Sequence, residues 1–340
     1  MKRSLLALAA LTAFAGAASA QSSVTLFGIV DAGVARLSAG GKNVTGMTNS
    51  GYNSSRFGVR GVEDMGGGLQ AGFWLEGQLT NDDGNAAGLN FQRRSTVSLM
   101  GGFGEIRLGR DYTPIFWNTT VYDPFGTNGV AQAMTPGMVG ANGNSANAVR
   151  ANNSVSYFTP AMGGFTLQVM KAFGENVSGG VKTNDFLGFR AGYAAGPVSV
   201  HGAYGKTEGA TDAADVKYMN FGASFNAGVV IPMLFIGQEK TGAGLKVRAI
   251  EAGVNVPVGA GAIRAAYTRH NTNSTVYDDW TKLGVGYLHN LSKRTTVYAT
   301  YARVTNDGTQ NKIVANNGLS LAGAAGKNAS GFEFGVRHAF

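Results

Sequence analysis

The sequence has no cysteine, few prolines and few charged residues. Of its 340 residues none is Cys, only 7 are Pro, and charged residues make up 14%. The absence of cysteine excludes disulfide stabilisation and zinc sites built on thiolates. Beyond the first residues, no apolar run reaches the roughly 20 residues that a membrane-spanning helix needs. Low proline content together with 10% aromatic residues argues against a disordered chain.

Histidine is also scarce, and the histidines lack the surroundings of a catalytic or metal site. The four are His201, His270, His289 and His338. His201 has no acid beside it in the sequence, and no paired histidine spacing suits a transition metal. We therefore expect neither an enzyme nor a resident cofactor. The acid pairs Asp82-Asp83 and Asp278-Asp279 offer oxygen ligands for calcium, although such pairs are more often simply solvated.

The first twenty residues have the pattern of a secretory signal peptide. Lys2 and Arg3 precede a short apolar run, which ends in the small residues Ala18-Ser19-Ala20. The run is too short to span a bilayer and no stop-transfer flank follows, which disfavours a membrane anchor. We predict that residues 1–20 are removed and that the mature chain begins at Gln21. Loss of Lys2 and Arg3 then lowers the formal charge from +8 to +6.

Most of the remaining chain alternates between apolar and polar residues. In LQAGFWLEGQL, residues 69–79, the odd-numbered positions are apolar or glycine, whereas Trp74, Glu76 and Gln78 share the other face. This period of two predicts strands, and the 52 glycines suit their many turns and close contacts. The pattern recurs at 23–37, 51–63, 69–82, 89–101, 103–110, 151–159, 164–173, 184–195, 198–206, 215–227, 229–238, 245–256, 261–271, 280–290, 294–305 and 329–340.

Short and long connections take turns between these segments. Tight, glycine-rich links such as 64–68 and 101–102 alternate with longer polar loops. The long loops are 38–50, 80–88, 111–150, 174–183, 207–214, 239–244, 271–279 and 306–328. This asymmetry is typical of an all-β fold, a transmembrane antiparallel β-barrel with short periplasmic turns and long external loops. These segments number sixteen, which agrees with the even number of strands in such barrels. We predict one barrel domain, residues 21–340.

A soluble all-β sandwich or lectin would alternate in the same way. It would have to hide all these apolar faces in its own interior, yet the opposite faces carry the polar residues that suit a wet lumen. An isoelectric point near 9.6 does not indicate nucleic-acid binding, because the basic residues are spread over alternate strand faces behind a leader.

The last ten residues, GFEFGVRHAF, form a distinctive segment. Phe332, Phe334, Val336, His338 and Phe340 share one face if the segment is a strand. The segment resembles the C-terminal strand of outer-membrane barrels, whose final Phe is read by the insertion machinery. An ordinary edge strand that ends in Phe is the alternative.

Four motifs together resemble the Gram-negative general porins, most closely the beta-proteobacterial type. They are VTLFGIVDAGV at 24–34, SSRFGVRGVEDMGGGLQAGFWLE at 54–76, GEIRLGRDYTP at 104–114 and the terminal GFEFGVRHAF. The resemblance implies a homotrimer of sixteen-stranded barrels in the Gram-negative outer membrane, surrounded by lipid and lipopolysaccharide. It also implies that the third external loop, here about 111–150, folds into the lumen and narrows each pore. We call it the constriction loop.

The same resemblance implies a ladder of basic residues on the wall opposite this loop. Arg56, Arg94 and Arg150 match the family's positions, and Arg60 lies one step along the wall from Arg56. Alternation places Arg56 and Arg60 on one face with Gly58, opposite Phe57 and Val59.

The alternation assigns further charged side chains near this ladder. Glu76 and Arg107 fall on inward faces and are expected to pair with the ladder, whereas Arg93 is expected to face outward near the external rim. Asp123, in YDPFG, is similar to the acid at the tip of the family's constriction loop, although here the acid precedes the proline.

Because 111–150 contains only two carboxylates, Asp111 and Asp123, the ladder is poorly neutralised, and arginine rings favour anions. We predict passive diffusion of small anionic and neutral hydrophilic solutes with a preference for anions. The alternative is a barrel that acts mainly as a structural protein, adhesin or receptor through its external loops; an enzyme barrel is less favoured.

Overall fold

The computed structural model describes residues 23–86, 88–133, 146–178, 181–276, 278–315, 318–319 and 321–340. The leader predicted at 1–20 lies outside these residues, as does the middle of the constriction loop. No helix within the described ranges is long and apolar enough to cross a membrane.

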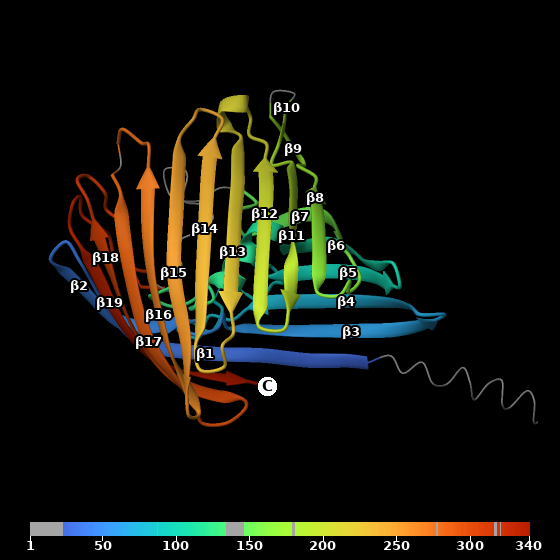
Figure 1. Ribbon diagram of the computed structural model, residues 1–340, viewed down its shortest axis with the longest axis horizontal. Helices are drawn as coiled ribbons and strands as arrows, with labels where there is room; N and C mark the ends of the chain where they lie inside the picture. Colours follow the sequence, from blue (N-terminus) through green and yellow to red (C-terminus); the bar gives the residue numbers. More distant parts are fainter. Residues whose placement is uncertain are drawn as a thin grey trace, which may run out of the picture.

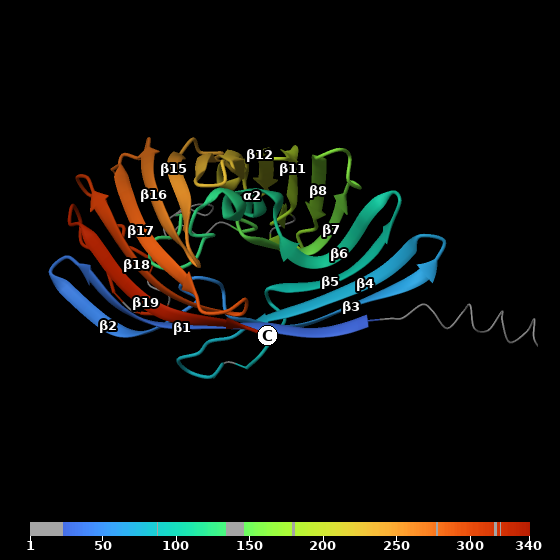
Figure 2. The same cartoon turned by 60° about the horizontal axis from the view of Figure 1, so that its bottom comes forward.

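Seventeen strands form one antiparallel sheet that closes on itself (Figures 1 and 2). They are β1 (Ser23–Ala39), β2 (Lys42–Asn49), β3 (Arg56–Gly66), β4 (Leu69–Gln78), β5 (Arg94–Gly101), β6 (Gly104–Tyr112), β7 (Arg150–Phe158), β8 (Phe165–Ala172), β11 (Phe186–Ala195), β12 (Val198–Thr207), β13 (Val216–Phe225), β14 (Ile231–Thr241), β15 (Lys246–Val258), β16 (Gly261–Thr272), β17 (Trp280–Asn290), β18 (Thr295–Asn306) and β19 (Ala329–Ala339). A separate small hairpin consists of β9 (Asn176–Ser178) and β10 (Val181–Thr183); the helical segments are α2 (Pro114–Tyr122) and η1 (Asp212–Ala214).

The barrel closes through β1, which pairs with β19 on one side and with both β2 and β3 on the other. Because β3 pairs with the first half of β1 and β2 with the second, β2 and β3 occupy one position in the ring. Seventeen segments thus make a sixteen-stranded barrel, which confirms the predicted fold. Hydrogen bonds of 3.0 Å in both directions join the backbones of Gly28 and Phe340 at the seam.

The predicted loop at 38–50 is wrong, because most of it forms a hairpin between β1 and β2. Gly40 and Gly41 adopt φ of 58° and 80°, the left-handed values that a tight hairpin turn requires. Conversely, residues 51–55, predicted as strand, form an irregular break between β2 and β3. The buried Asp31 carboxylate holds this break, because its Oδ2 accepts the N–H groups of Tyr52 at 2.8 Å and Asn53 at 2.5 Å.

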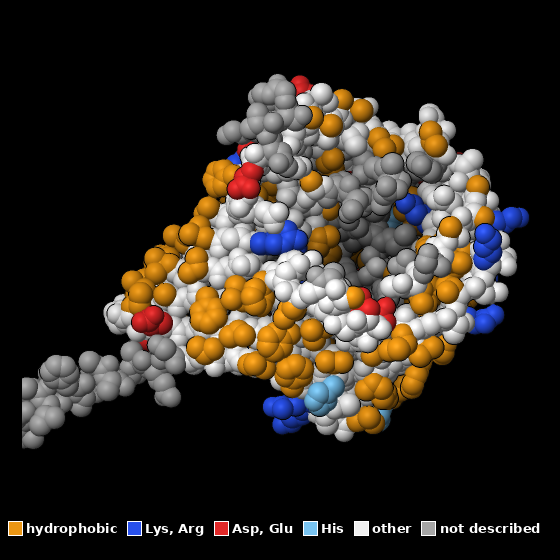
Figure 3. Space-filling model, turned by 180° about the vertical axis from the view of Figure 1, so that it is seen from behind, with side chains coloured by type: hydrophobic (Ala, Val, Ile, Leu, Met, Phe, Trp, Pro, Cys, Tyr) orange, Lys and Arg blue, Asp and Glu red, His pale blue; other side chains and the backbone are white. Residues whose placement is uncertain are grey.

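Side chains alternate across the barrel wall as predicted. In β19, Phe332 and Phe334 are exposed on the outside, whereas Glu333 between them is fully buried on the inside. Figure 3 shows apolar side chains gathered over the outer surface and a hollow in the centre of the molecule. The short connections lie at one rim and the long loops at the other, which matches the predicted asymmetry.

The constriction loop connects β6 to β7, and its first described part, residues 113–133, enters the barrel and begins with α2 (Figure 2). Pro114 occupies the first turn of α2, where its missing N–H costs nothing. Ile115 of α2 lies in an apolar cluster with wall residues that include Met170, Phe186 and Tyr218. One face of the helix is therefore fixed to the wall of β8 and β11–β13.

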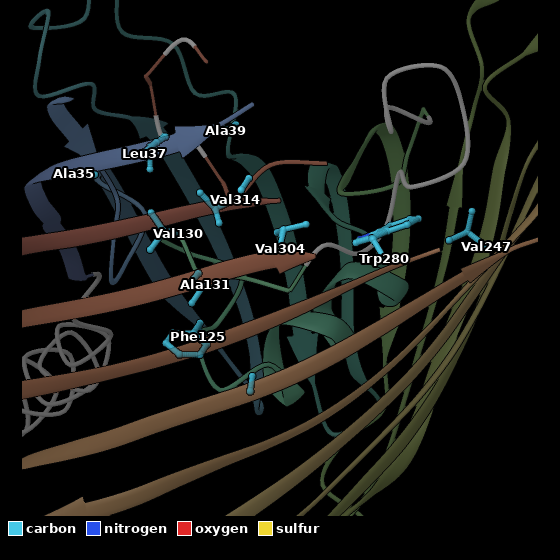
Figure 4. Packing of buried hydrophobic residues seen from close by; sticks show 13 residues of the cluster. Ala35, Leu37, Ala39, Phe125, Val130, Ala131, Val247, Trp280, Val304 and Val314 are labelled. Carbon is cyan, nitrogen blue, oxygen red and sulfur yellow. The ribbon is translucent and has the colours of Figure 1, made fainter. Parts of the chain in front are cut away.

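The part of the loop that directly follows α2 packs into another apolar cluster (Figure 4). Phe125, Val130 and Ala131 of the loop meet Leu37 of β1 and Val304 of β18, together with Val314 from the long loop that follows β18. Two clusters on different parts of the wall thus hold the constriction loop across the lumen.

Candidate functional site

The wall of the lumen over β3–β5 carries the predicted arginines on its inner face. The register pairs Arg56 with Gln78, Gly58 with Glu76 and Arg60 with Trp74, and it pairs Glu76 with Arg94. Since directly paired residues share a face of the sheet, all these side chains point inward together. The alternation read from the sequence is correct for these strands.

Glu76 lies at the centre of a first group of ion pairs on this wall. Its Oε1 lies 3.3 Å from Arg56 Nη1 and 2.7 Å from Arg93 Nε, and its Oε2 accepts the indole N–H of Trp74 at 3.1 Å. Both oxygens of this buried carboxylate are therefore occupied by donors, and its charge is shared by two guanidinium groups.

Arg93 does not face outward as predicted, because it lies inside the barrel and only 6% of it is exposed. Strand β5 begins at Arg94, so residue 93 precedes the paired segment and period-two alternation does not apply to it. Its Nη2 also donates to the hydroxyl of Tyr112 at 3.0 Å.

A second group of ion pairs lies further along the wall, on β5 and β6. Arg107 binds Glu105 through two hydrogen bonds of 2.9 Å, and its Nη1 lies 2.6 Å from Asp111 Oδ2. The same Asp111 oxygen lies 3.6 Å from Arg94 Nε. Arg107 thus pairs with the acids of its own strand more than with the ladder, and Asp111 joins it to Arg94.

Aromatic rings support the arginines between these two groups. The Trp74 ring centroid lies 4.9 Å from the guanidinium carbon of Arg60 and 4.4 Å from that of Arg94. Arg60, which is exposed to the lumen, forms no ion pair with any described residue. The indole stacks against both cations without neutralising them.

Arg150, the first residue of β7, completes the wall. Its guanidinium carbon lies 4.4 Å from the ring centroid of Tyr112, and its Nη2 donates to that hydroxyl at 2.9 Å. Its Nε donates to the backbone carbonyl of Arg93 at 2.9 Å. No described carboxylate pairs with Arg150 either, so it is held by neutral groups.

We call these six residues the arginine wall. It consists of Arg56, Arg60, Arg93, Arg94, Arg107 and Arg150, and its carboxylates are Glu76, Glu105 and Asp111. Six positive charges minus three negative charges leave a formal charge of +3. The excess lies in a lumen that is wet, where arginine stays ionised.

The constriction loop presents a neutral face to the lumen. On α2, Asn118 and Tyr122 are buried against the wall, whereas Trp117 and Val121 on the opposite side are 44% and 37% exposed. The sequence contains a single carboxylate between Tyr112 and Arg150, that of Asp123.

Asp123, which the sequence compares with the acid at the tip of the family's constriction loop, is buried. It is 4% exposed, and its carboxylate accepts the backbone N–H groups of Phe125, Thr127 and Ala133 at 2.8, 2.7 and 2.8 Å. This residue therefore shapes the turn after α2 and does not face the arginine wall. Because the acid precedes Pro124, its side chain is in place to cap the turn that follows.

Polar contacts that the sequence did not predict anchor the loop to the far wall. Tyr122 Oη lies 2.6 Å from His201 Nδ1, and Asn118 Oδ1 accepts a 3.0 Å hydrogen bond from Arg190. Lys282, fully buried on β17, donates to the Gln132 carbonyl at 2.6 Å. Alternation marks these wall residues as inward-facing, but it does not show which part of the loop meets them.

Comparison with known proteins gives a consistent result. The family model described as Gram-negative porin matches residues 7–309. Outer membrane porin protein 32 of Delftia acidovorans is 40% identical over the whole of both chains. An outer membrane porin protein of Bordetella pertussis is 31% identical, covering 88% of this chain and 93% of that one.

Among solved structures, an anion-selective porin from Comamonas acidovorans superimposes with a TM-score of 0.86 at 38% identity, covering 94% of this chain and all of that one. OmpT of Vibrio cholerae, at 18% identity and a TM-score of 0.67, shares the fold. The sixteen-stranded wall, the inward loop and these matches agree: the chain belongs to the Gram-negative porin family and is a general diffusion porin of the outer membrane, not an enzyme.

Proposed function

We propose that this porin prefers anions, and that the preference arises at the narrow region between the arginine wall and the constriction loop. One observation carries the proposal: the wall has a formal excess of three positive charges, whereas the loop opposite exposes no carboxylate. A carboxylate or phosphate that passes through this region is attracted by the arginine wall and is not repelled by the constriction loop. A small cation meets the arginines with no acid opposite to compensate for them.

The arrangement of partners on the wall supports this assignment. Glu76, Glu105 and Asp111 each contact at least one arginine at 2.9 Å or less, so their charges are already offset. Arg60 and Arg150 contact only aromatic and neutral groups among the described residues. They are the cations with most capacity left to attract a passing anion.

Solute flux into liposomes tests the proposal directly. We expect small monocarboxylates to enter porin-containing liposomes faster than neutral polyols of similar size. Entry of cationic amines of that size should be the slowest. Equal rates for the anion and the cation would contradict the charge assignment while leaving the diffusion pore intact.

We also propose that the protein assembles as a homotrimer through the outer face of β1, β3 and β4. Ala32 and Ala71 are small outward-facing residues there that permit close packing between barrels, whereas Gly28 and Gly61 lie under the rings of Phe340 and Phe73 of the same chain. A trimer resistant to mild detergent, seen by light scattering, is the expected result; a monodisperse monomer would contradict it.

Phe340 is proposed as the signal for membrane assembly, after export directed by residues 1–20. Its side chain is 44% exposed on the outside, and its backbone closes the seam with Gly28. We predict that deletion of Phe340 strongly reduces folded porin in the outer membrane, because it removes both the terminal ring and the last seam hydrogen bonds. Phe340→Tyr is the control and should assemble normally. Heat-modifiable migration of outer-membrane fractions measures the folded amount, and normal assembly of the deletion variant would contradict the assignment.

A further inference from the structure

A row of lysines crosses the outer face of the barrel. The strand register pairs Lys206 of β12 with Lys217 of β13, Lys217 with Lys240 of β14, and Lys240 with Lys246 of β15. Directly paired residues on antiparallel strands have Cβ atoms about 5 Å apart, and like charges at that distance destabilise a sheet. Strand pairing alone therefore does not account for four lysines that lie side by side on four adjacent strands.

These lysines point away from the lumen. Val216 and Tyr218, the neighbours of Lys217, are buried on the inside, as are Glu239 beside Lys240 and Val247 beside Lys246. None of the lysines in the row can therefore contribute to the arginine wall.

The row lies at the upper edge of the apolar band. It adjoins the long loops of the external rim, at the ends of β12–β15 that are uppermost in Figure 1. The next outward residue of β13 is Met219 and the one after it Phe221, which are 52% and 44% exposed. On β15 the exposed Ile250 follows Arg248. This is the level of the outer-leaflet headgroups.

Of these four lysines, Lys206 is the one that forms ion pairs with described residues. Lys206 Nζ lies 2.8 Å from Asp215 Oδ2 and 3.5 Å from Glu208 Oε1. Lys217, Lys240 and Lys246 have no carboxylate within 4.0 Å among the described residues; we call these three the lysine row.

Arg248 adds a fourth cation one step toward the apolar band. Its Nε donates to Gln238 Oε1 at 2.8 Å on the exposed surface, so the guanidinium is oriented beside the row. Neutral Gln238 fixes this cation without cancelling its charge.

We propose that the lysine row and Arg248 bind the phosphate groups of a polyphosphorylated glycolipid of the outer leaflet. Two strand spacings separate Lys217 from Lys246, roughly 10 Å, which suits a headgroup with more than one phosphate better than a single phosphate ion. The exposed apolar side chains directly beneath the row would contact the acyl chains of the same lipid. The row also lies on β13–β15, about halfway round the ring from β1, so trimerisation through β1, β3 and β4 leaves it open to lipid.

Binding of defined lipids, measured by native mass spectrometry on the intact porin in detergent, tests the proposal. The probes are bisphosphorylated lipid A, the same lipid without phosphates, and inorganic phosphate as competitor. The test variant carries Lys217→Gln and Lys240→Gln. The matched control carries Lys293→Gln and Arg294→Gln, two exposed cations in the turn between β17 and β18 at the opposite rim.

We expect the test variant to bind bisphosphorylated lipid A about 30-fold more weakly than the unaltered porin, and the control to bind it normally. Unchanged binding by the test variant would overturn the proposal. So would equal binding of the lipid without phosphates, which would assign affinity to the acyl chains alone. Displacement by inorganic phosphate at lipid concentrations would assign the row to free phosphate. Both variants should keep their ion selectivity, so failure here leaves the pore proposal standing.

Discussion

The two sides of the constriction are built on different principles. The arginine wall consists of charged side chains on rigid paired strands, and each carboxylate on it is bonded to an arginine. Helix α2 of the constriction loop turns Asn118 and Tyr122 toward the far wall and exposes Trp117 and Val121 to the lumen. In the function proposed above, the arginine wall supplies the electrostatic field and the constriction loop supplies the narrowing. A charge on either side should change selectivity, but a change in the loop's anchors should not.

Neutralising the wall should have the largest effect. Replacing Arg56, Arg94 and Arg150 by Gln lowers the formal charge of the wall from +3 to 0. We expect the anion-to-cation permeability ratio to fall about tenfold, because each lost charge near the path removes roughly 0.5 kcal/mol of attraction in a wet lumen. Reversal potentials across planar bilayers measure the ratio.

A variant with Lys217→Gln, Lys240→Gln and Lys246→Gln is the matched control for this experiment. It removes the same number of charges from the outer face of the barrel, outside the lumen. A fall in the ratio equal to that of the arginine variant would show that net charge, and not the wall, sets selectivity.

Placing an acid on the loop should have the next largest effect. Val121→Glu puts a carboxylate on the exposed side of α2, opposite the arginines. The expected result is a roughly threefold lower anion preference, from one charge at a comparable distance. Val121→Gln, measured in the same bilayers, should behave like the unaltered porin. A Val121→Glu porin with unchanged selectivity would place the ion path away from α2.

Removing an acid from the wall should sharpen the contrast. Glu76→Gln eliminates the carboxylate shared by Arg56 and Arg93, and it keeps an oxygen for the indole of Trp74. We expect the anion preference to rise about twofold, since the wall gains one unit of positive charge. A lower anion preference in the same salt-gradient assay would mean that Glu76 is needed to hold the arginines in place.

Loosening the loop should affect selectivity least. Tyr122→Phe removes the hydrogen bond to His201 at 2.6 Å and leaves the ring packed. We expect a loss of about 1 kcal/mol of stability, seen as a lower unfolding midpoint, with brief closures in single-channel records. The permeability ratio should stay unchanged, and a clear shift in it would show that the anchor contributes to the field.

Period-two alternation predicts side-chain direction wherever a strand is paired along its whole length. It correctly places Arg56, Arg60, Glu76, Arg94 and Arg107 inside the barrel. It fails for Arg93, which lies in a bend one residue before β5, although its backbone N–H donates to the Glu76 carbonyl at 3.0 Å. The hairpin of β1 and β2 is also not predicted from the sequence. The residues of β2 are mostly polar and resemble a loop, and only the structure shows that Gly40 and Gly41 turn the chain back onto β1.

The loop is harder to predict, because its contacts join residues far apart in the sequence. The sequence shows that Asp123 lies beside a turn, but only the fold shows that three backbone N–H groups surround its carboxylate. The anchors Tyr122–His201 and Lys282–Gln132 are likewise invisible to local patterns. The scarcity of acids in the loop could be predicted from the sequence, and the proposed anion preference depends on it.

The most direct test of this account is the reversal potential of the unaltered porin in a planar bilayer under a KCl gradient. An unneutralised arginine wall facing an uncharged loop predicts a potential close to that of a chloride-selective pore. A potential of the opposite sign, with potassium as the preferred ion, would contradict the account.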